Sequence, residues 1–206
     1  MEEMWNNRLY MPDAEAARRA EAYLEEMMAR KDSCGGVVEC VIRGMPVGVG
    51  EPVFDKLDAC LAKAMLSIGA VKGFEIGDGF EAARSLGSAN NDGFRMSRES
   101  EDQGLLFKDR IVKSSNHAGG TLGGISDGSD IVLRAAFKPT PSIAQRQHTV
   151  TRNGEEIDIE IKGRHDPIIV PRAVVVVEAM AALTAADLLL LSMTSRLDRI
   201  QEFFGR

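Results

Sequence analysis

The hydrophobic and polar positions of this chain alternate between a helical and a strand-like period. After Pro12-Asp13, apolar residues recur every three or four positions through residues 14–31, which predicts an amphipathic helix. Residues 35–44 alternate and are rich in β-branched side chains, which predicts a strand. The helical period returns over 53–68, and a strand-like pattern follows over 70–80. The core-facing positions predicted for the two helices are Ala17, Ala20, Leu24, Met27 and Met28 in the first, and Val53, Leu57, Cys60, Leu61, Ala64 and Met65 in the second.

The second half of the chain begins with a long stretch that lacks any such period. Residues 84–128 are polar and rich in glycine, and compact domains rarely carry so long an irregular stretch unless it is functional or disordered. A strand follows over 130–138 and ends at Pro139, and Asn153-Gly154 predicts the turn of a β-hairpin. Pro171 then begins a long apolar helix. The pattern predicts a single α+β domain over 1–206, a layered sandwich of antiparallel sheets and helices.

Composition narrows the classes of partner. The chain has 206 residues, of which 44% are hydrophobic, so it can bury a sizeable core. Its formal charge of −6 argues against general nucleic-acid binding. Residues 132–172 nevertheless hold seven basic and five acidic side chains, so we expect an anionic small molecule to bind in this part of the chain.

Cysteine usage and hydropathy bear on the compartment. Cys34, Cys40 and Cys60 show neither metal-ligand spacing nor a disulfide framework, so they are interpreted as buried apolar residues in a reducing compartment. The acidic N-terminus has no apolar signal-peptide region, which predicts a cytoplasmic protein. Residues 173–193 are apolar enough for a membrane span but contain two acids, which are costly at that depth, so a buried helix of a soluble protein is predicted.

A glycine-rich segment, "SSNHAGGTLGGISDGSD" at 114–130, is the first candidate for a binding site. Glycine lets backbone N–H groups approach a ligand closely and also permits the positive φ angles of tight turns. The segment matches neither the dinucleotide-binding pattern GxGxxG nor the ending of a phosphate-binding Walker loop. From these residues alone, both a ligand cradle and a structural turn are open.

Two further segments carry polar groups in restricted settings. "KPTPSI" at 138–143 places a lysine and two hydroxyls around two prolines, which limits the entropy lost on gripping a phosphate. "KGRHDPII" at 162–169 places Arg164 and Asp166 where they can brace one another or bind an anion. A solvated strand end and a charged hairpin exit are the structural alternatives.

His148 is interpreted as a structural or surface residue. The sequence carries no HExxH, GxSxG or CxxC motif, so zinc and serine hydrolases have no support.

Taken together, these segments resemble the C-terminal portion of the chorismate synthase family. The resemblance rests on residues 35–80, "SNHAGGTLGGISDG" at 115–128, "KPTPSI" and "KGRHDP", which occur in the order of the family. It implies an enzyme that eliminates phosphate from 5-enolpyruvylshikimate-3-phosphate to give chorismate, in aromatic amino acid biosynthesis. It also implies reduced FMN as the cofactor, which supplies electron density and receives the proton. A homotetramer, an association with NADP and no metal are implied as well.

The resemblance also assigns roles to individual residues. It implies that the glycine-rich segment lies against the flavin, and that Asp166 is an acid close to flavin and substrate. The flavin-binding positions that it implies are Gly69, Ala70, Gly123, Lys138, Pro139, Thr140, Pro141, Ser142 and Arg164.

The chain departs from the family by lacking the N-terminal half, which holds two histidines assigned to proton transfer and several substrate-binding arginines. The expectation is therefore a fragment that is inactive alone. Two other classes compete with this interpretation: a catalytically inactive remnant or engineered core that at most binds FMN, and an unrelated flavin- or phosphate-binding module.

Overall fold

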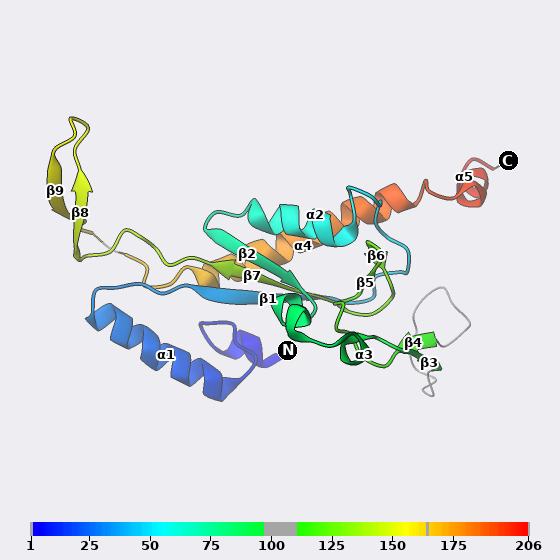
Figure 1. Cartoon of the computed structure of the whole chain (residues 1–206), viewed down its shortest axis with the longest axis horizontal. Coiled ribbons are helices and arrows are strands. Elements are labelled where there is room, and N and C mark those ends of the chain that lie inside the picture. The colour runs from blue at the N-terminus through cyan, green and yellow to red at the C-terminus, as the bar shows by residue number, and fades with distance from the viewer. Residues whose placement is uncertain (1, 97–110, 164, 206) are drawn as a thin grey trace. The chain divides into compact units, whose positions relative to one another are not determined.

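The computed structural model describes residues 2–96, 111–163 and 165–205 (Figure 1). The chain forms two compact units, and each is assembled from two separate segments. The first unit comprises Met1–Val38 and Ala136–Val175, and the second comprises Glu39–Ala135 and Val176–Arg206. The single domain expected from the sequence stays a prediction.

The first unit begins with the 3₁₀ helix η1 (Glu2–Asn6) and the amphipathic helix α1 (Ala14–Ala29). Asp13 caps α1, because its carboxylate accepts a hydrogen bond of 2.7 Å from the backbone N–H of Ala16. This bond holds the pKa of the Asp13 carboxyl below its usual value. Of the predicted stripe, Ala17 and Met27 are buried, whereas Met28 is exposed. The predicted helix is confirmed, with a narrower buried face than expected.

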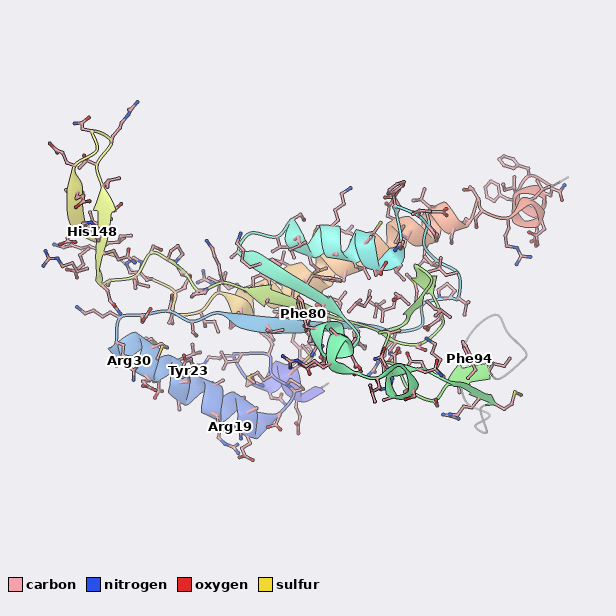
Figure 2. All side chains as sticks on the ribbon, in the orientation of Figure 1. Arg19, Tyr23, Arg30, Phe80, Phe94 and His148 are labelled. Carbon is pink, nitrogen blue, oxygen red and sulfur yellow. The ribbon has the colours of Figure 1, made fainter. Side chains whose placement is uncertain are left out.

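The β-hairpin predicted around Asn153-Gly154 is also in the first unit. Strands β8 (Arg146–Val150) and β9 (Glu156–Glu160) pair antiparallel, and Gly154 has the positive φ of the turn. Figure 2 shows His148 on this hairpin, where its ring lies 3.2 Å from Asp158 Oδ1. The ring is largely exposed, which confirms the prediction of a surface histidine.

A three-stranded sheet is the central element of the fold. Its strands are β1 (Gly36–Ile42), β7 (Ile131–Phe137) and β2 (Val71–Ile76), in the order β1-β7-β2 (Figure 1). The central strand β7 buries every second side chain, namely Ile131, Leu133, Ala135 and Phe137. The sequence predicted all three strands, and the prediction of β1 rested on its alternation.

Helix α2 (Leu57–Leu66) packs on this sheet in the second unit. It buries four of the predicted core positions, Leu57, Leu61, Ala64 and Met65. Val53 was expected on the same face but is 71% exposed. The reason is local: the backbones of Glu51 and Asp55 exchange two hydrogen bonds, so this turn precedes the helix and delays its start.

Short elements occupy the part of 84–128 that the structure describes, where the sequence predicted irregular chain. After the 3₁₀ helix η2 (Gly79–Arg84) comes the single turn α3 (Gly87–Asn90). Two small antiparallel ribbons follow. Their strands are β3 (Phe94–Met96) with β4 (Ile111–Lys113), and β5 (Thr121–Leu122) with β6 (Ile125–Ser126). Helices together with small antiparallel sheets confirm the α+β class.

The predicted apolar helix is α4 (Val170–Ser192), which is followed by the short helix α5 (Leu197–Phe203). One stripe of α4 is buried, formed by Ala173, Val177, Ala181, Ala185 and Leu188. The opposite side is exposed, and Leu183 and Leu190 lie there. The helix predicted from the sequence is therefore present and packs along one stripe, and its burial in a core or at a subunit interface on the other side stays a prediction. By length and composition alone, α4 could cross a membrane. Core helices of soluble proteins meet the same two criteria.

Candidate functional site

The glycine-rich segment 114–130 is anchored by one carboxylate, that of Asp92. Its Oδ1 accepts hydrogen bonds from the Ser115 hydroxyl at 2.7 Å and from the His117 backbone N–H at 2.9 Å, and it lies 2.8 Å from His117 Nδ1. Its Oδ2 accepts the backbone N–H of Ala118 at 3.0 Å. The segment is therefore fixed by a network that fills both oxygens of one buried acid.

Buried charges complete this anchor. Lys113 lies 3.7 Å from Asp92 and donates a hydrogen bond to Asp127, and the side chains of all three residues are at most 5% exposed. Burial opposes the ionisation of Asp92, but the hydrogen bonds from Ala118, His117 and Ser115 outweigh it and hold the pKa of this carboxyl well below its usual value. Burial likewise opposes ionisation of Asp127, and the Lys113 ammonium lowers its pKa.

Two glycines allow the segment to lie directly against the end of β2. A Cβ atom on Gly119 would lie 2.3 Å from the backbone nitrogen of Gly77, and one on Gly77 would lie 2.0 Å from the carbonyl oxygen of His117. Both residues have positive φ. Any side chain at either position would separate the two backbones.

The far end of the segment packs at the start of α2. The Leu57 N–H donates to the carbonyl of Gly124 at 2.9 Å, and the buried hydroxyl of Ser126 accepts the N–H of Val49 at 2.9 Å. Gly123 differs, because a Cβ there would meet no atom within 4 Å. Gly123 is thus an open position on an otherwise fixed loop.

Gly69 and Ala70, the other flavin-binding positions expected in the second unit, follow the opposite end of α2. The helix has ten residues, so it separates them from Gly124 by about 15 Å along its axis. Ala70 has a φ of +72°, a left-handed conformation that a residue with a side chain seldom adopts. Such strain is typical of positions that serve a function.

A cavity of about 320 Å³ opens beside the anchor. Figure 2 shows Phe94 on the adjacent ribbon, and its ring lies 6.0 Å from the Lys113 ammonium. The residues that line the cavity are Gly87, Asn90, Asn91, Asp92, Phe94, Lys113, Ala118 and Leu122. Its charged groups are already paired with one another, so the remaining polar lining is that of the two asparagines.

The segment 138–142 lies in the first unit, between β7 and β8. Lys138 is exposed, whereas the Thr140 hydroxyl is buried and has no hydrogen-bond partner among the described residues. The backbone of Thr140 is held, since its carbonyl accepts the Ser33 hydroxyl at 2.7 Å. A buried hydroxyl without a partner costs stability, so this group is one that a ligand could satisfy.

Asp166 lies shortly before α4 and binds an arginine in the first turn of that helix. Its two oxygens accept hydrogen bonds from Arg172 at 2.7 and 3.1 Å. The sequence suggested Arg164 as the brace for Asp166, but Arg164 lies outside the described residues. The residue after Asp166 is held by the loop that follows α1, since the Cys34 N–H donates to the carbonyl of Pro167 at 2.8 Å.

Sequence reasoning missed Asp92, Lys113 and Ser33, which fix the candidate binding segments. Asp92 follows two asparagines, so its local sequence predicts an ordinary turn. The local sequence of Ser33 predicts only a loop after α1. Their partners lie 14 to 107 residues away, beyond the reach of any local pattern.

Comparisons with known proteins bear on the identity of this arrangement. A family model described as chorismate synthase matches residues 1–190. The chorismate synthase of Agathobacter rectalis is 60% identical over 204 residues, which cover 99% of this chain and 53% of that protein. The chorismate synthase of Archaeoglobus fulgidus is 57% identical over 185 residues, which cover 89% of this chain and 48% of that protein.

A solved crystal structure of chorismate synthase has the same fold. It matches with a TM-score of 0.74 and 32% sequence identity, over 99% of this chain and 52% of that chain. The chain thus spans about half the length of the relatives that it matches. Because the family model covers nearly all of its residues, this chain belongs to the chorismate synthase family.

Proposed function

We propose that this chain provides the C-terminal part of an FMN-dependent chorismate synthase, which eliminates phosphate from 5-enolpyruvylshikimate-3-phosphate. The observation that carries the proposal is the 60% identity to a chorismate synthase over 99% of the chain. We further propose a cytoplasmic homotetramer that is associated with NADP.

The residues present fit a flavin with a phosphate tail. In the first unit, Lys138 is exposed, and two residues further along the chain the buried Thr140 hydroxyl lacks a partner among the described residues. A cation and a free hydroxyl together suit phosphate oxygens. Considered by itself, the second unit offers Gly123, which presents open backbone on a loop that Asp92 fixes. Bound reduced FMN would supply electron density to the breaking C–O bond and accept the ring proton.

The chain's own residues have separate tasks in this proposal. Lys138, Thr140 and Ser142, with the rigid Pro139 and Pro141 between them, bind and orient the cofactor with little entropy left to lose. The Asp166 carboxylate relays a proton near the flavin, and Arg164 supplies a fixed cation. The chain covers only about half of its relatives' length, so we propose that alone it does not turn over substrate.

The substitution Thr140→Val tests the binding role. It replaces a buried, unpaired hydroxyl by a methyl group of the same shape, so the free protein should be as stable as wild type or slightly more stable. FMN binding should weaken about fivefold to tenfold, because one hydrogen bond to the ligand is lost. Thr149→Val, at a half-buried position of the hairpin strand β8, is the matched control and should change neither quantity.

Fluorescence titration with FMN and a phosphate-release assay with reduced flavin separate the alternatives. FMN binding that is weaker in Thr140→Val than in wild type supports the cofactor site. Phosphate release, once the rest of the enzyme is supplied, supports the proposed reaction. Binding of FMN without phosphate release in that assembly would favour the catalytically inactive remnant. A wild-type chain that does not bind FMN would contradict the cofactor assignment.

A further inference from the structure

The loop after α1, residues 32–36, joins the two segments of the first unit that carry candidate binding residues. On one side, the Ser33 hydroxyl donates to the carbonyl of Thr140 at 2.7 Å. On the other side, the N–H of Cys34 donates to the carbonyl of Pro167, next to Asp166, at 2.8 Å. Two neighbouring residues thus hold segments that lie 27 residues apart in the sequence.

The approach of this loop to residues 137–139 leaves no room for another side chain. A Cβ on Gly35 would lie 2.4 Å from the Phe137 carbonyl oxygen and 3.3 Å from Pro139 Cδ. One on Gly36 would lie 3.0 Å from Val170, the first residue of α4. The loop is therefore built for close contact with both segments.

The backbone of Thr140 is held by a side chain, because the residues on either side of it cannot donate a backbone hydrogen bond. Pro139 and Pro141 have no N–H group to donate. The Pro141 carbonyl accepts Gln147 Nε2 at 3.0 Å and the Ile143 N–H at 3.1 Å, but the only hydrogen bond that reaches the Thr140 carbonyl among the described residues comes from Ser33. The hydroxyl of Thr140, which has no partner, is carried on this same backbone.

We propose that Ser33 is a positioning residue, which fixes the backbone of Thr140 so that the buried hydroxyl and the Lys138 ammonium face the flavin phosphate. The inference rests on the proposed function for the identity of the ligand. The Ser33–Thr140 hydrogen bond is present in the structure whatever the ligand is. Ser33 acts through Thr140 and makes no contact with the ligand.

The test compares Ser33→Ala with Ser33→Thr, which keeps a hydroxyl, in the full 206-residue chain. Ser192→Ala is the matched control, because the Ser192 hydroxyl donates to a backbone carbonyl, that of Leu189, at 2.8 Å near the end of α4. Two readouts are needed: amide hydrogen exchange over residues 140–147 without ligand, and the dissociation constant of FMN from fluorescence.

In Ser33→Ala, exchange over 140–147 should rise about fivefold to tenfold, the effect of one lost hydrogen bond. The FMN dissociation constant should rise by a similar factor. Ser33→Thr should restore both quantities most of the way to wild type, and Ser192→Ala should leave both at the wild-type value.

Each of the remaining results overturns the inference. Unchanged exchange in Ser33→Ala would show that the bond does not fix the segment, whatever happens to FMN. Faster exchange with unchanged FMN affinity would show that the segment does not need to be fixed for binding. A wild-type chain that fails to bind FMN would overturn the cofactor proposal and the ligand role of Ser33, while the exchange data would still report on the bond.

Discussion

Asp166 and Arg172 form a two-pronged ion pair in which both carboxylate oxygens accept a guanidinium N–H. The pair links the residue assigned as an acid near the flavin to the first turn of α4. Arg172 is largely exposed and Asp166 is one-third exposed. The pair therefore orients Asp166 but contributes little to stability, since exposed ion pairs are worth about 0–1 kcal/mol.

Arg172→Gln and Asp166→Asn should consequently separate orientation from chemistry. Both should lower the thermal midpoint only slightly, because each removes the same exposed pair. In the assembled enzyme, Asp166→Asn should lower turnover about tenfold to a thousandfold, the range for one acid–base group. Thermal melts and phosphate release on the two variants check this. An Asp166→Asn protein that melts early but retains its specific activity would mean that Asp166 is only a brace.

Protonation of Asp92 should destabilise the folded chain at acidic pH. Its pKa is lower in the folded chain than the 3.8 of a free carboxyl, so its contribution to stability is present above about pH 4 and is lost as the pH falls further. Asp92→Asn should flatten this part of the stability–pH curve. Urea unfolding between pH 3 and pH 7 measures it, and a variant that keeps the wild-type acid slope would contradict the assignment.

Removing the Asp92 side chain should be severe at neutral pH. Asp92→Ala leaves buried donors on Ser115, His117 and Lys113 without this acceptor, which should cost about 3–5 kcal/mol. Asp58→Ala is the control, because Asp58 is half-buried and, among the described residues, accepts one local hydrogen bond, from the N–H of Ala59. Its cost should stay within about 0.5 kcal/mol. Similar midpoints for the two variants in urea would show that Asp92 is not an anchor.

Gly119→Ala and Gly123→Ala should differ although both positions have positive φ. Gly119→Ala forces its Cβ into the backbone of Gly77, so we expect it to destabilise the chain by more than about 2 kcal/mol. Gly123→Ala meets open space and bears only the conformational cost of about 1 kcal/mol. If Gly123 contacts the flavin, its variant should lose FMN affinity beyond that cost. Equal thermal midpoints would contradict the packing described for Gly119.

Two leucines of α4 provide a matched pair for the packing of this helix. Leu188 is 3% exposed and Leu183 is 66% exposed. Leu188→Ala should cost about 2–5 kcal/mol, whereas Leu183→Ala should cost well under 1 kcal/mol in the isolated chain. Chemical unfolding of both variants measures the difference. A large cost at Leu183 would show that another surface covers this face in solution.

Local patterns in the sequence determined most of the secondary structure. The pattern before Pro139 predicts the strand β7, although not its central place in the sheet, and the spacing of Leu57, Leu61, Ala64 and Met65 predicts the buried face of α2. Asn153-Gly154 predicts the hairpin turn. These features follow from the periods of strand and helix and from the φ angles of a turn, all of which depend on residues a few positions apart.

Tertiary structure alone decided how the candidate segments are held. The sequence paired Asp166 with a near neighbour, but the chain brings Arg172 back to it through the first turn of α4. It also could not show that the acid at 92 would anchor the glycine-rich segment, or that Ser33 would meet Thr140, because hydrogen bonds between distant residues depend on how whole elements pack. Likewise, the uniform apolarity of α4 carries no period, so only packing against the rest of the chain selected the stripe that is buried.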